Sequence, residues 1–122
     1  GRFLILSSIA SNADLLVLPV DGSAKPTPFF SSEEQESQAA FSPDGRWIAY
    51  LSNSGGQSEI FVRRFPDASG RQQISTQGGR QPRWSADGSQ LCYISQGRIF
   101  AVSFQSKDGS AGRPRELFAL VN

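Results

Sequence analysis

Short apolar runs alternate with turns along this chain, and the runs have the length and composition of β-strands. Trp47–Ser52 and Arg98–Phe104 are rich in aromatic and β-branched residues, and Gly or Pro recurs between such runs. A helix would need apolar residues three or four positions apart over a longer stretch, which none of these runs provides. The pattern therefore predicts an all-β fold without helices.

The most regular of these runs is apolar on both of its faces. In an extended strand, Trp47, Ala49 and Leu51 lie on one side, and Ile48 and Tyr50 lie on the other. A strand with one face in water would alternate apolar and polar residues instead. The run therefore predicts a sheet that is covered on both faces by neighbouring sheets.

Part of the sequence is repeated. The segment Phe41–Ser52 (FSPDGRWIAYLS) matches Trp84–Ser95 (WSADGSQLCYIS) at an offset of 43 residues, and Gly1–Ser7 matches Gly45–Leu51 more loosely at an offset of 44. A period of this length with four short strands per unit is typical of the blades of a β-propeller. The sequence therefore predicts a propeller fragment of about three four-stranded antiparallel blades.

The predicted blades span residues 1–34, 35–77 and 78–122. The first blade lacks its innermost strand, which would precede Gly1, so we expect eleven strands. They are predicted at about Phe3–Ser7, Asp14–Val20 and Pro28–Ser31, at Gln38–Ser42, Trp47–Ser52, Glu59–Arg64 and Gln72–Thr76, and at Gln81–Ser85, Gln90–Ser95, Arg98–Phe104 and Arg115–Ala119.

Two equivalent turns join the first and second strands of the later blades. Ser42–Gly45 (SPDG) and Ser85–Gly88 (SADG) carry Asp and Gly at the positions where a tight hairpin needs them. We expect Asp44 and Asp87 to accept hydrogen bonds from nearby backbone N–H groups. The acidic run of Glu33, Glu34 and Glu36 is expected to be a solvated loop between blades.

The segment Phe41–Ser52, followed by Glu59–Val62 (EIFV), resembles the PD40 repeat of TolB-like propellers, a branch of the WD40-like blades. The segments Ile60–Pro66, Gln73–Gly79, Gln81–Ser85 and Gly112–Phe118 are similar to C-terminal propellers of bacterial Ser/Thr protein kinases and of some winged-helix regulators. This resemblance covers nearly the whole chain. It implies a sensor or protein-interaction module and not a catalyst.

The chain contains no His, which removes the usual Ser-His-Asp triad, most zinc sites and the commonest general base. We therefore predict no catalytic residues, no metal site and no cofactor. The pectate-degrading lyases that share such blades would need a metal-binding His cluster. Cys92, in the middle of a predicted strand, is expected to be a small buried apolar residue.

Arg80 and Arg83 are the candidate ligand-binding residues. The innermost strand of a blade lines the central channel, and the loop before it opens onto one face of the propeller. The competing interpretation is that both are solvated or paired across strands. A net charge of +1 predicts no attraction to nucleic acid, and no apolar run is long enough to cross a membrane. The compartment, cytoplasmic or extracytoplasmic, stays undetermined.

We predict a non-catalytic propeller module that binds a protein or ligand, as the sensor or interaction part of a larger bacterial signalling protein. One alternative is the regulatory N-terminal propeller of a prolyl oligopeptidase-like serine hydrolase, whose triad would lie outside this segment. Another is a periplasmic TolB-like partner-binding protein. Flanking sequence would separate these possibilities, because a Gly-x-Ser-x-Gly motif marks such hydrolases.

A propeller needs at least four blades to close, so three cannot form a ring. The chain begins at Gly1 and has no Met, from which we expect an excised piece of something longer or an engineered sequence. Its partners are expected to be the remaining blades of the same propeller, or a second copy that completes a six-bladed ring. The isolated chain is predicted not to be a stable monomer.

Overall fold

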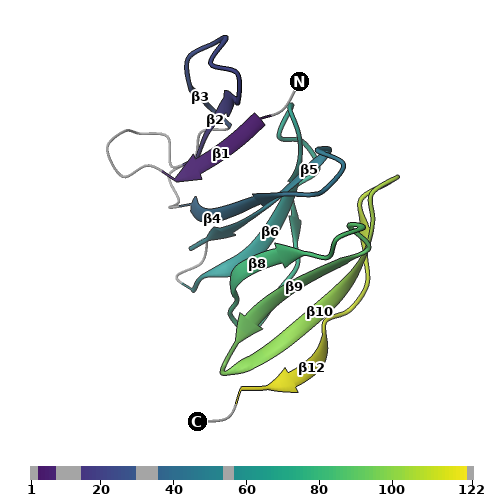
Figure 1. Cartoon of the computed structure of the whole chain (residues 1–122). Coiled ribbons are helices and arrows are strands. Elements are labelled where there is room, and N and C mark those ends of the chain that lie inside the picture. The colour runs from purple at the N-terminus through teal and green to yellow at the C-terminus, as the bar shows by residue number, and fades with distance from the viewer. Residues whose placement is uncertain (1–2, 8–14, 30–35, 54–56, 121–122) are drawn as a thin grey trace.

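The structure is a computed structural model that describes residues 3–7, 15–29, 36–53 and 57–120. Within these ranges the chain forms strands and no helix (Figure 1). The strands pair antiparallel into sheet 1 (β1–β3), sheet 2 (β4–β7) and sheet 3 (β8–β12). Their bounds are β1 Phe3–Ser7, β2 Leu15–Pro19, β3 Thr27–Pro28, β4 Glu36–Phe41, β5 Trp47–Ser52, β6 Glu59–Arg64, β7 Gln72–Gln73, β8 Arg80–Trp84, β9 Gln90–Ser95, β10 Arg98–Gln105, β11 Ser110–Ala111 and β12 Arg115–Ala119.

The predicted all-β class is confirmed, and the central strands β5, β6 and β9 have the predicted bounds. The outermost strands differ from the prediction. In sheet 2 the N–H groups of Ile74 and Ser75 both point to the carbonyl of Ile60, at 2.7 and 3.4 Å, so the ladder ends at Gln73 and not at Thr76. In sheet 1 the outermost strand is Thr27–Pro28, and Ser31 lies outside the described residues.

Sheet 3 contains one strand more than predicted. The outermost position is divided between β12, which pairs with Arg98–Ala101, and the short β11, which pairs with Phe104 and Gln105 at the far end of β10. The described residues therefore form twelve strands where eleven were expected. The reason is that β12 pairs only with Arg98–Ala101, so the outer edge of Phe104 and Gln105 is left to pair with β11.

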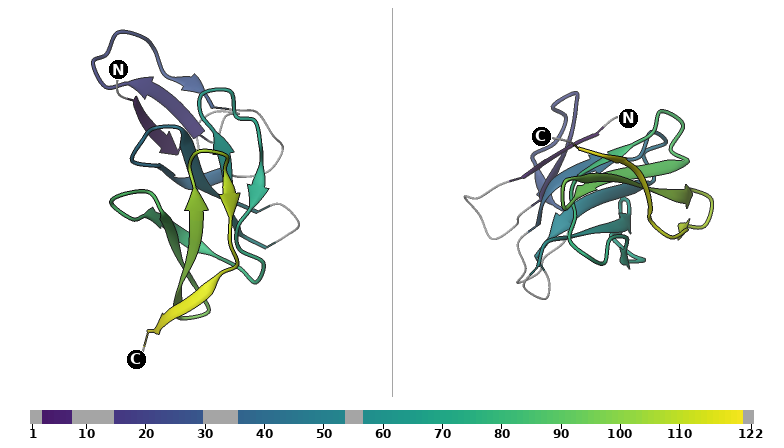
Figure 2. Two further views of the ribbon diagram at one scale, coloured as in Figure 1. Left: turned by 90° about the vertical axis from the view of Figure 1, so that its right-hand side faces the viewer. Right: turned by 90° about the horizontal axis from the view of Figure 1, so that it is seen from below.

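Sheet 2 lies between the other two sheets, as Figures 1 and 2 show from different sides. Its strand β5 is buried on both faces, with Trp47 3%, Ile48 0%, Ala49 0% and Tyr50 1% exposed. One apolar cluster fills the space between sheets 2 and 3: Trp47, Ala49, Ile60, Val62, Ile74, Leu91, Tyr93, Val102 and Phe104. A second fills the space between sheets 1 and 2: Leu15, Val17, Phe29, Ile48, Tyr50, Phe61 and Ala68. The prediction of a sheet covered on both faces is confirmed.

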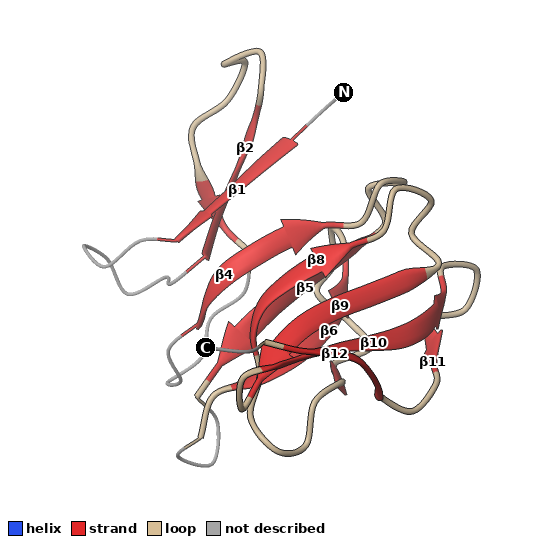
Figure 3. Cartoon of the chain, turned by 60° about the horizontal axis from the view of Figure 1, so that its bottom comes forward, coloured by secondary structure: helices blue, strands red, loops and turns tan. Residues whose placement is uncertain are grey.

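The innermost strands β4 and β8 lie next to each other (Figure 3) and are linked by side chains. Each strand has a bulge with a Gln in the left-handed region, Gln38 at φ 51° and Gln81 at φ 55°. The amide N–H of Gln81 donates to Oε1 of Gln38 at 2.7 Å, and Nε1 of Trp84 donates to the carbonyl of Ala40 at 3.1 Å. The bulge is therefore present in both repeats, and the two innermost strands are joined by hydrogen bonds at and beside it.

The two aspartate turns form as expected. In the first, the carboxylate of Asp44 accepts from Ser42 Oγ at 2.6 Å and from the N–H of Arg46 at 3.0 Å. Asp87 accepts from Ser85 Oγ at 3.0 Å and from the N–H of Ser89 at 3.0 Å. Asp44 has one further donor, because Ser106 Oγ from the β10–β11 turn also bonds to its carboxylate. The expected capping role is confirmed for both residues.

Asp44 should make the stability of the chain depend on pH. Burial raises the pKa of Asp44, but hydrogen bonds from Ser106, Ser42 and the backbone of Arg46 together bring the pKa below its ordinary value of 3.8. A carboxyl whose pKa is depressed in the folded state stabilises it above the unfolded pKa and loses this effect as pH falls through the folded pKa. Asp44→Asn should therefore be less stable than the parent at pH 7, with a difference that narrows below about pH 4. Urea unfolding of the parent and of Asp44→Asn, at pH 7 and below about pH 4, measures the two free energies of unfolding. A difference between them that stays constant with pH would contradict this role of Asp44.

Candidate functional site

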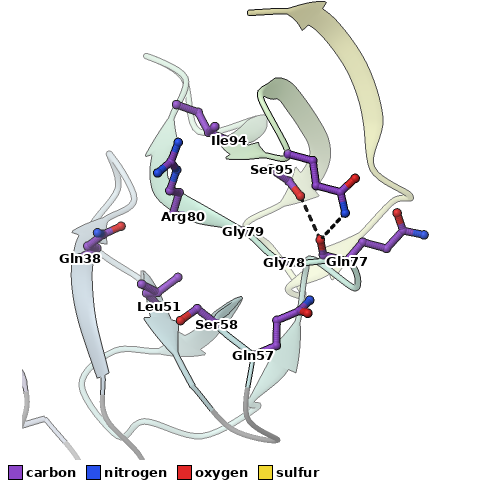
Figure 4. Close-up of a pocket in the computed structure, with 11 residues that line it drawn as sticks. Gln38, Leu51, Gln57, Ser58, Gln77, Gly78, Gly79, Arg80, Ile94 and Ser95 are labelled. Atoms are coloured by element: carbon purple, nitrogen blue, oxygen red, sulfur yellow. Dashed lines mark hydrogen bonds between the residues drawn. The ribbon is translucent and has the colours of Figure 1, made fainter.

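A pocket of about 340 Å³ opens between sheets 2 and 3, where the turn that joins β7 to β8 meets the ends of β5 and β9 (Figure 4). We call it the Arg80 pocket. Its lining comes from both sheets and is mostly polar and uncharged: Gln38, Leu51, Gln57, Ser58, Gln77, Gly78, Gly79, Arg80, Ile94, Ser95 and Gln96. Arg80 is the only one of these residues with a formal charge.

The β7–β8 turn is held in place by a buried carboxylate. Glu59 on β6 is only 6% exposed, and its oxygens accept from the N–H of Gly78 at 3.1 and 3.0 Å, from Nε2 of Gln57 at 3.0 Å and from Ser75 Oγ. Ser75 Oγ in turn accepts from the N–H of Ile60 at 2.8 Å. Several donors compensate the loss of water around a buried charge, so the carboxylate fixes the turn.

Gly79 lies where the turn packs most closely on sheet 2. A Cβ at this position would be 2.8 Å from Ser75 Oγ and 2.9 Å from Ile60 Cγ1, although the backbone of Gly79 is not in the left-handed region. The absence of a side chain therefore lets the β7–β8 turn pack directly against Ser75, whose hydroxyl bonds to Glu59.

We expect Gly79→Ala to destabilise the chain by about 1–3 kcal/mol, because the added methyl group must displace buried atoms. The matched control is Gly112→Ala, where the nearest atom to an added Cβ is Ser103 Cβ at an ordinary 3.6 Å. Urea midpoints of the two variants measure the difference. Equal midpoints would contradict the proposed close packing.

The turn is also joined to sheet 3 by its own carbonyl group. Ser95 Oγ donates to the carbonyl oxygen of Gln77 at 3.1 Å, and Nε2 of Gln96 donates to the same oxygen at 3.3 Å (Figure 4). On the side of the innermost strands, Gln38 is fixed through its bond to Gln81. The pocket therefore has walls that are positioned by hydrogen bonds from both sheets.

The structure separates the two arginines that the sequence singled out. Arg80 begins β8 opposite Ile94 and lines the pocket, and its guanidinium makes no hydrogen bond or ion pair with any described residue. Arg83 pairs with Cys92 in the ladder, is exposed, and donates from Nη1 to the carbonyl of Pro82 at 3.4 Å. It does not line the Arg80 pocket.

Cys92 is partly exposed and not buried as expected, because it lies on the face of sheet 3 that is turned away from sheet 2.

The pocket offers one guanidinium together with amide and hydroxyl groups. These groups can hold a carboxylate or another polar anion by charge-assisted hydrogen bonds. Across the part of the chain that the structure describes, no group of three or more Cys, Asp or Glu side chains could hold a metal ion. The same residues include no helix long and apolar enough to cross a membrane.

Sequence reasoning did not identify Glu59, Gln57 or Gln77. Glu59 and its partners Ser75 and Gly78 are far apart along the chain and meet only through the pairing of β6 with β7. One signal was available, since Gln38 and Gln81 occupy equivalent positions of the repeat. A polar residue that repeats at the same position of two innermost strands indicates a role that packing does not explain.

No model of a protein family matches this chain, and no curated protein matches it. Solved structures do match. A protein assigned as TolB from Agrobacterium tumefaciens aligns over 87% of this chain with a TM-score of 0.60 and 23% identity, and an oligogalacturonate lyase in complex with manganese aligns over 85% with a TM-score of 0.58 and 18% identity. The chain spans 42% and 29% of those two chains.

The neighbours are β-propellers, so the three sheets are blades of a propeller. More particularly, the fold is that of a segment of a TolB-like propeller, and the predicted fold is confirmed. At these identities the likeness shows the fold and not what the chain binds.

Proposed function

We propose that this chain is a non-catalytic propeller segment that binds a protein partner or ligand through the Arg80 pocket, as the sensor or interaction part of a larger bacterial signalling protein. The observation that carries the proposal is the Arg80 guanidinium, which lines a preformed pocket without a partner among the described residues. Such a group fits a partner that presents a carboxylate.

The lining of the pocket supports binding over catalysis. It contains amide, hydroxyl and apolar side chains with one arginine, whose guanidinium donates hydrogen bonds and accepts none. Glu59 stands behind the turn, where its carboxylate is engaged by Ser75, Gly78 and Gln57. Recognition needs fixed donors of this kind, and proton transfer needs a titratable group in reach of the ligand.

Binding is tested with sodium acetate as the probe, followed by the NMR signals of Arg Nε–H and of the Gly78 and Gly79 amides. We expect saturable shifts that Arg80→Gln abolishes. Arg83→Gln is the matched control, because Arg83 is an exposed arginine of the same strand outside the pocket. Equal losses in both variants, or no saturable shift in the parent, would overturn the assignment of the pocket.

The signalling context is tested by the parent gene. A kinase or winged-helix domain upstream of this segment supports the proposal. A Gly-x-Ser-x-Gly motif downstream would overturn it in favour of a serine hydrolase, and an upstream secretion signal without either domain would overturn it in favour of a TolB-like envelope protein.

A further inference from the structure

A second pocket of about 440 Å³ lies between sheets 2 and 3, beside the outer strands of sheet 3. We call it the Tyr93 pocket. It shares Gln77, Gly78, Ser95 and Gln96 with the Arg80 pocket, and its other lining residues are Thr76, Tyr93, Phe100, Arg113 and Pro114. Among the described residues, no acidic side chain lines it. Both sheets that enclose it are present in the chain, so its shape does not depend on a missing blade.

The floor of this pocket is a stacked aromatic pair. The rings of Tyr93 and Phe100 have centroids 5.6 Å apart and an interplanar angle of 15°. Tyr93 is only 4% exposed, yet its hydroxyl makes no hydrogen bond with a described residue. Every fully buried side-chain polar atom of the described residues has a partner, so this hydroxyl reaches the open space of the pocket.

The preceding blade shows what covers the same aromatic pair when the chain itself does so. Tyr50 and Phe61 stack with centroids 6.0 Å apart at 23°. Nε of Arg63 donates to the Tyr50 hydroxyl at 2.9 Å, and the guanidinium of Arg71 lies over the Phe61 ring at 4.2 Å from its centroid. Arg71 also bonds to the Tyr50 hydroxyl. In sheet 2, two guanidinium groups of the chain itself therefore contact the aromatic pair.

Sheet 3 retains the aromatic pair but lacks both arginines. The pairing of Tyr50 with Phe61 corresponds to that of Tyr93 with Phe100, which aligns the two ladders residue by residue. In this alignment Val102 stands at the position of Arg63. Because Val62–Gln72 corresponds to Ala101–Arg115, Pro114 stands at the position of Arg71. The Tyr93 pocket is thus the space that a guanidinium fills in the neighbouring blade.

We propose that the Tyr93 pocket binds the guanidinium group of an arginine side chain of a protein partner. The guanidinium stacks on the Phe100 ring and donates a hydrogen bond to the Tyr93 hydroxyl, as Arg71 and Arg63 do around Phe61 and Tyr50. An arginine over an aromatic face gains both cation–π and stacking energy, which a lysine provides less well. This is a second site, and it does not depend on what the Arg80 pocket binds.

The charges near the pocket act in opposite directions. Burial, and then the negative charge of Glu59, raise the pKa of Tyr93 to about 12, so its hydroxyl is neutral and can accept a hydrogen bond at neutral pH. The Glu59 carboxylate attracts a cation to the same place. Arg113 repels one, but it is exposed and surrounded by solvent, which weakens the repulsion.

The test is a titration of the whole chain with N-acetyl-arginine amide, followed by the amide NMR signals of Gln77 and Gly78. N-acetyl-lysine amide and sodium acetate are the comparison probes. We expect the arginine probe to bind at least about tenfold more tightly than the lysine probe. Tyr93→Phe should weaken it about tenfold, because a hydrogen bond to a charged donor is lost. Tyr50→Phe, at the equivalent position of sheet 2, should leave it unchanged.

Two further variants decide the sign of the ligand charge. Pro114→Arg should abolish binding of the arginine probe, because the chain then supplies the guanidinium itself as it does in sheet 2. Arg113→Gln should tighten binding, because a like charge is removed. Saturable acetate binding that Arg113→Gln abolishes and Arg80→Gln spares would instead identify an anion site and overturn the proposal. Unchanged arginine binding in Pro114→Arg would also overturn it, whereas a failure of the Arg80→Gln test alone would leave it intact.

Discussion

Trp47→Ala is expected to destabilise the chain by about 3–5 kcal/mol, the range for truncating a buried aromatic residue. Trp47 is 3% exposed and makes three contacts, two with the strand and turn of sheet 3 and one within sheet 2. Its ring packs edge-on against Phe104 at 5.3 Å, its Nε1 donates to the carbonyl of Ser106 at 2.9 Å, and Arg64 lies over it at 4.5 Å from the ring centroid. The substitution would leave a cavity between two sheets and an unpaired carbonyl in the β10–β11 turn.

Trp47→Phe separates these contributions. Phe retains an aromatic ring beside Phe104 but cannot donate to Ser106, and it no longer fills the space next to Gly109. An added Cβ at Gly109 would be only 2.3 Å from Cη2 of Trp47, so the β10–β11 turn is shaped around the indole. We expect a loss of about 1–3 kcal/mol for Trp47→Phe. Chemical denaturation measures both variants, and a loss for Trp47→Ala no larger than that for Trp47→Phe would contradict this account.

The central strands could be predicted because their determinants are local. In β5 and β9 an apolar run on two faces follows a turn whose Asp and Gly fix where the strand starts. The outermost strands lack such determinants. β7 and β11 are held by pairs of residues at the edge of a sheet, so their ends depend on the direction of a few N–H groups that no sequence pattern records.

The candidate sites were predictable only where the repeat itself placed a residue. Arg80 follows a Gly-Gly turn at the start of an innermost strand, and this position was visible in the sequence. Glu59 was not predictable, because its role depends on the distance between β6 and the β7–β8 turn. The Tyr93 pocket was not predictable either, because it becomes apparent only when the strand registers of sheets 2 and 3 are compared. Val102 and Pro114 correspond to Arg63 and Arg71 only after the two ladders are aligned.

Both outer sheets expose apolar side chains, and these surfaces carry our second prediction of large effect. On β1, Leu4 and Leu6 are 48% and 51% exposed. Their equivalents in the repeat, Ile48 and Tyr50, are 0% and 1% exposed because sheet 1 covers them. At the other end of the stack, Phe118 of β12 is 65% exposed. Each outer face thus has the composition that packs against another blade within the chain.

We propose that the chain self-associates through these faces, with sheet 1 of one copy packed on sheet 3 of another, and that two copies form a closed ring of six blades. Closure by two-fold symmetry buries both faces of each copy at once and leaves none to continue an open chain of copies. Sedimentation velocity should therefore show a dimer at micromolar concentration.

Leu4→Glu combined with Leu6→Glu should shift this dimer to monomer, with a dissociation constant at least about 100-fold higher. Each leucine contributes roughly 1.5–3 kcal/mol when it is buried, and about 1.4 kcal/mol corresponds to a factor of ten. Ala24→Glu is the control, because Ala24 is an exposed residue of the turn between β2 and β3 and does not belong to a strand of sheet 1. A folded parent chain that stays monomeric at every concentration would contradict the ring. So would a dimer that survives the double substitution, because the burial of Leu4 and Leu6 is what should hold the two copies together.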